Sequence, residues 1–297
     1  MPMIPRLARQ APRLGDGPRG VPDLRPAAHA RGGEGVNTIE PYAHGDRWTL
    51  YKGDSLAILP TLEKRHGKVS MVCTDPPYSS GGAMRGDRTG STSSKYLRSD
   101  SAQAEYLPQF AGDNRDARGF LMWSALWMGA ALDISNVGSV IACFCDWRQW
   151  TATTDAMQAG GWVWRGVVPW MKPAPRPSKG RFAQSSEFVP WGSAGPMSDD
   201  GDCHAGHWLG MPPHGREHIT QKPLEFMRML VAIAPTESII LDPFNGSGTT
   251  GVAALLRGCH YIGIERTEEY CAISARRLME AAGGMGEGKA GQMGLLG

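Results

Sequence analysis

The amino-acid sequence predicts a doubly wound α/β fold, in which helices cover both faces of one mixed sheet. Apolar runs of strand length alternate with helix-like segments over most of the chain. Two of these runs end in the same Asp-Pro step, at Asp75 and at Asp242, and the second leads directly into a glycine-rich turn and a helix. Since ligands bind to such sheets outside the carboxyl ends of the strands, we expect both Asp-Pro steps to border one crevice.

The individual elements follow from hydrophobic periodicity, helix caps and turn residues. Strands are expected at residues 48–51, 68–75, 138–145, 162–170, 238–242 and 260–265. Helices are expected at residues 55–64, 119–132, 151–161, 223–234, 249–258 and 267–283. Periodicity fails between Met171 and Arg216, which predicts an inserted irregular lobe, and the polar residues 79–118 predict a functional or mobile loop.

The composition indicates a globular chain without a membrane segment. The 297 residues suffice for one large domain, or for one domain with a sizeable insertion. Thirty-one Lys and Arg against 29 Asp and Glu give a net charge of only +2, so a surface that binds a polyanion must arise from local clustering. No apolar stretch reaches the roughly 18 residues of a membrane span, and a signal peptide is not evident. We expect a cytoplasmic protein whose six cysteines are reduced.

The first 36 residues differ in composition from the rest of the chain. Residues 1–36 are rich in Arg, Pro, Gly and Ala and contain almost no β-branched residues, which predicts a disordered basic leader. We favour a dispensable leader over an arm that touches nucleic acid. Loss of activity on deletion of residues 1–36 would decide for the arm.

The turn after Asp242 indicates a cofactor site. Gly246, Gly248 and Gly251 match the pattern G-x-G-x-x-G, and Glu265 follows Gly246 by 19 residues at the end of the next strand. An acidic side chain there can accept hydrogen bonds from both hydroxyls of a ribose. Asp242 favours a cofactor with an amino group over one with a pyrophosphate. A dinucleotide site and a tight turn without a ligand are the alternatives.

The motif Asp75-Pro76-Pro77-Tyr78 and the downstream motif "DPFNGSGTT" together resemble those of the β class of DNA amino-methyltransferases. The resemblance covers residues 45–280. It implies a Rossmann-like methyltransferase fold and S-adenosylmethionine as the cofactor. The corresponding division of the chain is a catalytic half at residues 37–172, a target-recognition insertion at 173–216, a cofactor-binding half at 217–283 and a flexible tail at 284–297.

The resemblance also implies which residues hold the cofactor. The segment "HITQKP", residues 218–223, is similar to the family's motif that approaches the methionine carboxylate, and Lys222 beside a helix N-terminus is physically suited to an anion. The residues expected at the cofactor are Thr74, Asp75, Thr220, Gln221, Lys222, Pro223, Asp242, Pro243, Phe244, Asn245, Gly246, Ser247, Gly248, Thr249, Thr250, Glu265 and Arg266.

The DPPY motif suits methylation of an exocyclic amino group. The lone pair of that nitrogen is delocalised into the base, so acceptors must hold the nitrogen before it can attack a methyl sulfonium. Asp75 and the backbone carbonyl of Pro76 supply acceptors, and Pro77 helps to stiffen the loop. Tyr78 offers a face on which a flipped base can stack. Direct transfer of this kind requires no metal.

Adenine N6 is the expected target. Cytosine N4 is the closest alternative, although the family more often has Ser in place of Asp75 for that base. Carbon methylation needs an activated thiolate, usually in a Pro-Cys pair, which the chain lacks. A nicotinamide-dependent oxidoreductase and a non-catalytic DNA-binding protein are more remote. Enzymes that methylate RNA or protein glutamine usually have Asn at this position and place the cofactor motif first.

The resemblance places three more residues near the target base. Asp54 matches an acidic residue of the family and also suits a helix N-cap, and the two roles are compatible. Trp170 and Lys172 fall where the family has residues beside the base pocket. An ordinary strand tryptophan is an equally good interpretation of Trp170.

Basic residues cluster in two segments, and the second interleaves them with aromatic residues, as is typical of nucleic-acid surfaces. The residues expected to contact DNA are Arg85, Arg88, Lys95, Arg98, Arg165, Arg176, Lys179 and Arg181. We expect these loops to clamp a duplex around the flipped base while residues 173–216 read the sequence. Two ordinary solvated loops are the alternative.

One further cluster has ligand-like spacing. Cys203, His207, His214 and His218 could hold zinc, but a single thiolate in a loop favours solvated side chains, so no metal is expected.

The expected partners are double-stranded DNA and a second copy of the chain. A small recognition lobe reads few base pairs alone, which favours a homodimer on a short palindromic site. The chain has no nuclease signature, so it fits a solitary bacterial or phage enzyme at the nucleoid, or one half of a restriction pair.

Overall fold

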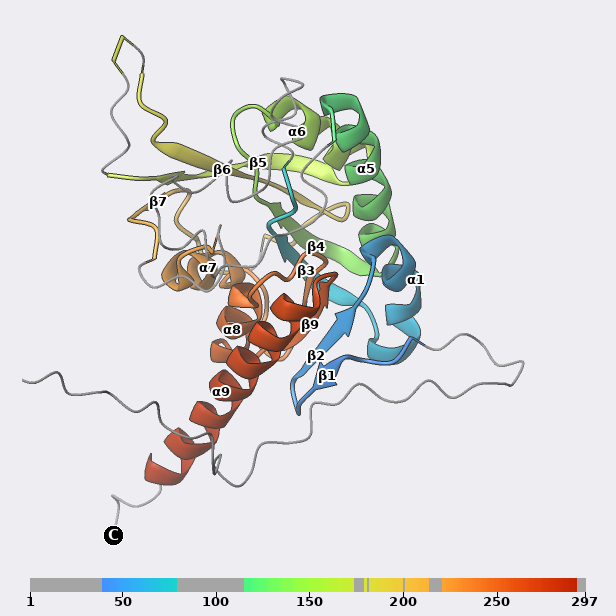
Figure 1. Cartoon of the computed structure of the whole chain (residues 1–297), viewed down its shortest axis with the longest axis vertical. Coiled ribbons are helices and arrows are strands. Elements are labelled where there is room, and N and C mark those ends of the chain that lie inside the picture. The colour runs from blue at the N-terminus through green and yellow to red at the C-terminus, as the bar shows by residue number, and fades with distance from the viewer. Residues whose placement is uncertain are drawn as a thin grey trace, which may run out of the picture. The chain divides into compact units, whose positions relative to one another are not determined.

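The computed structural model describes residues 39–78, 115–173, 179–180, 182–199, 201–213 and 221–292, with side chains up to residue 284. These residues form a nine-stranded sheet with the strand order β1-β2-β9-β8-β3-β4-β6-β5-β7 (Figure 1). The expected strands and helices are present within a few residues of their predicted limits, apart from the end of the last helix. The predicted α/β fold is confirmed.

Five neighbouring strands in the middle of the sheet run parallel: β2 (Trp48–Lys52), β9 (His260–Glu265), β8 (Ile239–Asp242), β3 (Val69–Thr74) and β4 (Ser135–Cys143). The chain leads from β3 to β4 in one direction and from β8 to β9 in the other, so the winding reverses between β3 and β8. These two strands are directly paired, with Val72 opposite Leu241. Such a reversal is where α/β sheets bind ligands.

Beyond β4 the sheet is mixed, since the next strand runs antiparallel to both of its neighbours and the last two strands are parallel to each other. β6 (Ser186–Ser193) lies between β4 and β5 (Val163–Met171), and β7 (Trp208–Leu209) extends the edge next to β5. At the opposite edge, β1 (Ala43–His44) pairs with β2.

The prediction of irregular structure throughout residues 173–216 is therefore wrong for the part that forms β6. Val189 and Ser193 of this strand are fully buried. The strand sequence "SEFVPWGS" contains a proline and small residues, which are uncommon inside strands and hid it from pattern analysis. The domain boundaries themselves remain a prediction.

Helices cover the two faces of the sheet (Figure 1). One layer contains α1 (Ser55–His66), α5 (Ala117–Asp133) and α6 (Trp150–Ala159), and the other contains α7 (Leu224–Val231), α8 (Thr249–Leu256) and α9 (Glu268–Gln292). Each layer buries its own apolar cluster, with Leu59 and Trp127 in the first, and Phe226 and Leu278 in the second. Burial of this apolar surface is the main force that holds the helices to the sheet.

The last helix is longer than expected. α9 runs to Gln292, whereas the sequence predicts that the folded part ends near Gly283 and is followed by a flexible tail. Glycine at positions 283 and 284 is a poor helix former, and this lowers the helical signal of the segment. Among the residues that the structure describes, no helix is long and apolar enough to cross a membrane.

Candidate active site

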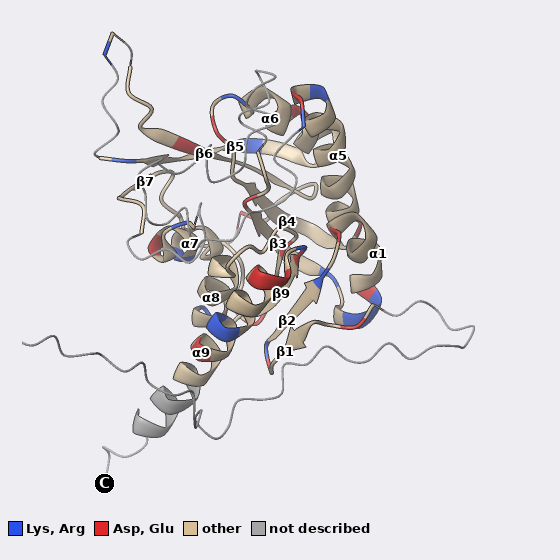
Figure 2. Ribbon diagram, viewed as in Figure 1, with Lys and Arg blue, Asp and Glu red and all other residues tan. Residues whose placement is uncertain are grey.

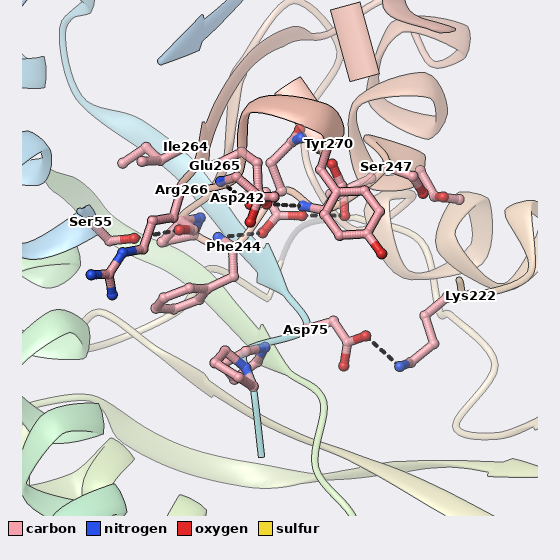
Figure 3. A pocket seen from close by; sticks show the side chains of 18 of the residues that line it. Ser55, Asp75, Lys222, Asp242, Phe244, Ser247, Ile264, Glu265, Arg266 and Tyr270 are labelled. Carbon is pink, nitrogen blue, oxygen red and sulfur yellow. Dashed lines mark hydrogen bonds and ion pairs between the residues drawn. The ribbon is translucent and has the colours of Figure 1, made fainter. Parts of the chain in front are cut away.

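The two Asp-Pro steps border one pocket, as predicted (Figure 3). The pocket lies at the carboxyl ends of β2, β9, β8 and β3, where the winding of the sheet reverses. The predicted site residues that line it are Asp54, Asp75, Pro76, Pro77, Tyr78, Gln221, Lys222, Asp242, Pro243, Phe244, Asn245, Gly246, Ser247, Thr249, Thr250, Glu265 and Arg266. Segments that are far apart in the sequence therefore meet in one place.

Asp242 organises the floor of the pocket. Its carboxylate is buried and accepts hydrogen bonds from the hydroxyls of Thr74 and Thr250, each over 2.6 Å, and from the backbone N–H of Phe244 over 3.0 Å. Burial raises the pKa of Asp242 to about 6, and these hydrogen bonds oppose the shift. Two of the bonds end on Oδ1 and one on Oδ2, so Oδ2 retains a lone pair for a ligand.

The glycine-rich turn requires its glycines. Gly248 has a φ of 79°, and a Cβ atom at this position would lie 2.4 Å from the hydroxyl of Ser274. The backbone N–H of Gly246 donates to Glu265 over 2.8 Å, and Thr267 N–H donates to the other oxygen of Glu265 over 2.8 Å. Burial raises the pKa of Glu265, while the backbone donors favour its ionised form. The turn and the acidic residue thus form one unit.

Some of the pocket residues predicted to hold the cofactor also support the turn. The buried amide of Asn245 accepts hydrogen bonds from Tyr261 over 2.8 Å and from Ser274 over 3.3 Å. Arg277 of α9, which sequence reasoning missed, donates to the carbonyl of Ser247 over 2.6 Å and to the hydroxyl of Thr249 over 3.2 Å. A helical arginine gives no sequence signal for this role.

An aromatic wall borders the pocket on the side of α5. The ring of Phe244 packs against Trp123 and Trp127, with centroids 5.1 Å apart in both pairs. The guanidinium of Arg115 lies 4.0 Å from the centroid of Trp123. Trp123 and Arg115 both line the pocket, but sequence reasoning missed them. The segment around Trp123 is apolar throughout, so it predicts a buried helix and gives no sign of a residue that faces a ligand.

Asp54 follows β2 and lines the pocket. It is the N-cap of α1 and accepts a hydrogen bond from Leu56 N–H over 3.0 Å. The preceding Gly53 donates to the carbonyl of Glu265 over 2.9 Å, because β2 pairs with β9. Two strands, β9 and β8, separate Asp54 from the strand that ends at Asp75. Asp54 shares the pocket with the DPPY loop, and its place beside the target base stays a prediction.

The DPPY loop places its acid and its phenol together. Tyr78 donates a hydrogen bond from its hydroxyl to Oδ1 of Asp75, and the ammonium of Lys222 binds Oδ2 (Figure 3). Burial raises the pKa of Asp75, and the positive charge of Lys222 opposes this shift. The pKa of Lys222 would be lowered by burial, but the carboxylates of Asp75 and Glu187 outweigh burial and raise it. The sequence predicts that Lys222 lies at an anion site for the methionine carboxylate of the cofactor, and the structure places its ammonium against the carboxylate of Asp75.

Trp170 is a core residue. Only 2% of it is exposed, its indole N–H donates to the carbonyl of Gly210 over 2.8 Å, and its ring packs against Trp208 and Phe226. The prediction that Trp170 contacts the target base is corrected, because no face of the ring is accessible. Lys172 lies over this ring, with its ammonium 4.6 Å from the centroid, and binds Glu187 over 2.5 Å.

Little of the predicted DNA surface is described. The predicted residues that lie outside the described residues are Arg85, Arg88, Lys95, Arg98, Arg176, Arg181 and Thr220. Arg165 is bound to the sheet, since its guanidinium donates to Ser193 over 3.0 Å and to the carbonyl of Gly195 over 3.1 Å. Lys179 is exposed, and so is Phe182, at 96%. In Figure 2, little of the ribbon along the described part of β5 and β6 has the colour of Lys and Arg.

The possible zinc ligands do not form a cluster that the structure describes. Cys203 and His207 are exposed, and His214 and His218 lie outside the described residues. Within the described ranges, no group of three or more His, Cys, Asp or Glu side chains is arranged to hold a metal ion.

Comparison with known proteins defines the class of this chain. Residues 69–276 match the model of the N6_N4_Mtase family, described as DNA methylase, and this is more than half of the chain. The chain therefore belongs to this family of DNA methylases. It is a DNA methyltransferase, as the two sequence motifs predicted.

Several relatives and solved structures are similar over most of their length. Type II methyltransferase M2.MboI from Moraxella bovis is 24% identical, over 82% of this chain and 92% of the relative. M2.LlaDCHI from Lactococcus lactis subsp. cremoris is 26% identical, over 84% and 95%. The M1.HpyAVI–SAM complex has a TM-score of 0.56 at 23% identity, covering 78% of this chain and 98% of the other. The cytosine-N4-specific PvuII DNA methyltransferase has a TM-score of 0.58 at 16% identity, covering 80% and 92%. These solved structures confirm the methyltransferase fold.

Proposed function

We propose that this enzyme transfers a methyl group from S-adenosylmethionine to the exocyclic N6 of an adenine flipped out of duplex DNA. The observation that carries the proposal is the meeting of the DPPY loop and the glycine-rich turn in one pocket. The DPPY loop supplies the acid that holds the amino group, and the glycine-rich turn supplies the surface that binds the methyl donor. Since the two loops follow neighbouring strands, donor and acceptor are brought together without a conformational rearrangement of the sheet.

The pocket residues fit the chemical groups of S-adenosylmethionine. Glu265 accepts hydrogen bonds from ribose hydroxyls, and the remaining lone pair of Asp242 accepts one from the amino group. Phe244 and Trp123 offer apolar faces to the adenine ring of the cofactor. Asp54 lies near Glu265 and can accept a hydrogen bond from the polar edge of the same adenine ring.

The reaction depends more on the positioning of the methyl donor and the target amino group than on chemical activation of either. When bound, S-adenosylmethionine supplies an electrophilic methyl group, which the amino nitrogen takes as one N–H proton and a neutral thioether are released. Asp75 accepts a hydrogen bond from the target amino group and takes up that proton. Tyr78 and Lys222 hold the two oxygens of Asp75, so the carboxylate is fixed before the substrate arrives.

The carboxylate at position 75 is the reason to favour adenine over cytosine. The N4 group of cytosine would be methylated by the same chemistry, and one structural neighbour is a cytosine-N4-specific enzyme. The test is incubation of the enzyme with genomic DNA and S-adenosylmethionine, followed by mass spectrometry of the nucleosides. N6-methyladenine is expected, and N4-methylcytosine alone would replace adenine with cytosine as the target.

We also propose that the enzyme acts as a homodimer on a short, palindromic site, with residues 173–216 reading the sequence. Light scattering with and without DNA tests the assembly. A dimer with DNA bound is expected, and a monomer under both conditions contradicts the proposal.

A further inference from the structure

A buried row of alternating charges extends from Asp75 away from the cofactor side of the pocket. The ammonium of Lys222 binds Asp75 and lies 3.5 Å from Oε2 of Glu187, and the other oxygen of Glu187 binds Lys172 over 2.5 Å. The four side chains come from separate segments: the end of β3, the residue before Pro223 and α7, the start of β6 and the residue after β5. The sequence predicts roles for Asp75 and Lys222, but it predicts none for Glu187.

Folding does not explain this row. The side-chain exposures are 6% for Lys222, 21% for Glu187, 22% for Asp75 and 24% for Lys172. Oε2 of Glu187 is buried, and its partner is the ammonium of Lys222 at 3.5 Å. Desolvation of buried ion pairs costs about as much as their attraction returns, so the row contributes little net stability. Such an arrangement points to a role in the reaction.

Each charge in the row changes the proton affinity of Asp75 in a defined direction. Lys222 alone would hold the carboxylate ionised but make it a poor proton acceptor. Glu187 also pairs with Lys222, and its negative charge makes the electrostatic potential at Asp75 more negative. Lys172 in turn neutralises part of the charge of Glu187. The effects on Asp75 therefore alternate in sign along the row.

We infer that Glu187 is a positioning residue: by holding Lys222 between two carboxylates, it leaves Asp75 ionised yet basic enough to take the amino proton released during methyl transfer. The inference rests on the proposed function. The proton moves from the target nitrogen to the Asp75 carboxylate, and no other reactant is needed.

The other titratable groups around Asp75 that belong to the described residues do not compete with this row. They are Tyr78, Asp242, Cys73, Cys143 and Cys145. Burial raises the pKa of the phenol and of the three thiols, so these groups are neutral at working pH. Asp242 belongs to the cofactor side, and saturation with cofactor removes its titration from the measured rate.

The test is the pH dependence of kcat at saturating S-adenosylmethionine and DNA, for the wild type and two variants. Glu187→Gln removes a negative charge, so Asp75 stays ionised to lower pH and the acidic limb of the profile shifts down. Lys172→Met removes a positive charge, and the acidic limb shifts up. Glu187→Gln also lowers kcat roughly tenfold or more, because Asp75 becomes a weaker base, while KM for the donor stays within about twofold. Lys172→Arg restores the wild-type limb.

The control is Glu225→Gln, which removes an exposed carboxylate that pairs with Arg228 on α7. Its profile should match that of the wild type. The inference is overturned when the acidic limbs of the kcat profiles coincide in all variants. It is also overturned when they shift in the same direction for Glu187→Gln and Lys172→Met. Should Glu187→Gln fail to fold, the more exposed Lys172→Met decides alone, and an unmoved limb contradicts the inference. A wild type that transfers no methyl group refutes the proposed function instead.

Discussion

The hydroxyl of Thr74 donates a hydrogen bond to the carboxylate of Asp242 over 2.6 Å, and thereby joins two strand ends that are 168 residues apart in sequence. Thr74 immediately precedes Asp75, the proposed catalytic residue, and Asp242 begins the loop that leads to the glycine turn. A buried hydrogen bond therefore connects the DPPY loop with the loop proposed to bind the cofactor. The position of one loop depends directly on that of the other.

The substitution Thr74→Val tests this contact. It keeps the shape of the side chain but leaves Asp242 without one of its donors, so we expect the free energy of unfolding to fall by about 1–3 kcal/mol. Affinity for S-adenosylmethionine should fall as well, measured by calorimetry. Thr74→Ser keeps the hydroxyl and serves as the control, with both quantities near the wild-type values.

The ionisation of Asp242 predicts a pH dependence of cofactor affinity. Because burial raises its pKa to about 6, the carboxylate that we propose receives the cofactor's amino group is lost as the pH falls below that value. Affinity measured by calorimetry should be full above pH 7 and decline below about pH 6. In Asp242→Asn the affinity should be lower and nearly independent of pH over the same range.

The same group affects stability with the opposite sign. The pKa of Asp242 is higher in the folded protein than its ordinary value of 3.8, so the folded state binds the proton more tightly. Its contribution to stability is present below about pH 4 and is lost as the pH rises through about 6. Thermal unfolding of Asp242→Asn compared with the wild type isolates this contribution, which should be missing from the variant.

Asp75→Asn tests the catalytic carboxylate. The amide keeps the size of the side chain but cannot take up a proton, so kcat should fall by roughly 10²- to 10⁴-fold while donor affinity is retained. Transfer of radiolabelled methyl to DNA gives kcat, and calorimetry gives the affinity. Wild-type kcat in this variant contradicts the assigned role.

Gly248→Ala tests the glycine turn. The new Cβ atom meets Ser274 at 2.4 Å in a left-handed conformation, so strain and overlap add up to about 2–4 kcal/mol of lost stability. Gly258→Ala has a similar φ of 81° in the left-handed turn that ends α8, and its new Cβ atom would lie 3.9 Å from the nearest atom, so it should show only the conformational part, about 1 kcal/mol. Chemical unfolding compares the two. Equal losses contradict the role of the close approach to Ser274.

The sequence was sufficient to predict the two loops, because each rests on local determinants. Asp75 and Asp242 end apolar runs, and the glycines follow at fixed spacing, so the ends of β3 and β8 could be located without a structure. That these strands are neighbours followed from the general rule for reversal of winding in α/β sheets.

The errors arose where a role depends on contacts between segments. The strand order, which no local pattern specifies, places two strands between Asp54 and the DPPY loop. Trp170 alternates with partly exposed neighbours on β5, and only the packing of Trp208 and Phe226 decides that it is buried. Glu187 lies in a segment without periodicity, so its contact with Lys222 could not be inferred.

The central claim is that the DPPY loop and the glycine turn form one methyl-transfer site. The most direct measurement is a crystal structure of the enzyme with S-adenosylmethionine bound. We expect the ribose at Glu265 and the methyl carbon directed toward Asp75 and Pro76. A cofactor bound elsewhere, or one whose methyl group faces away from Asp75, contradicts the account.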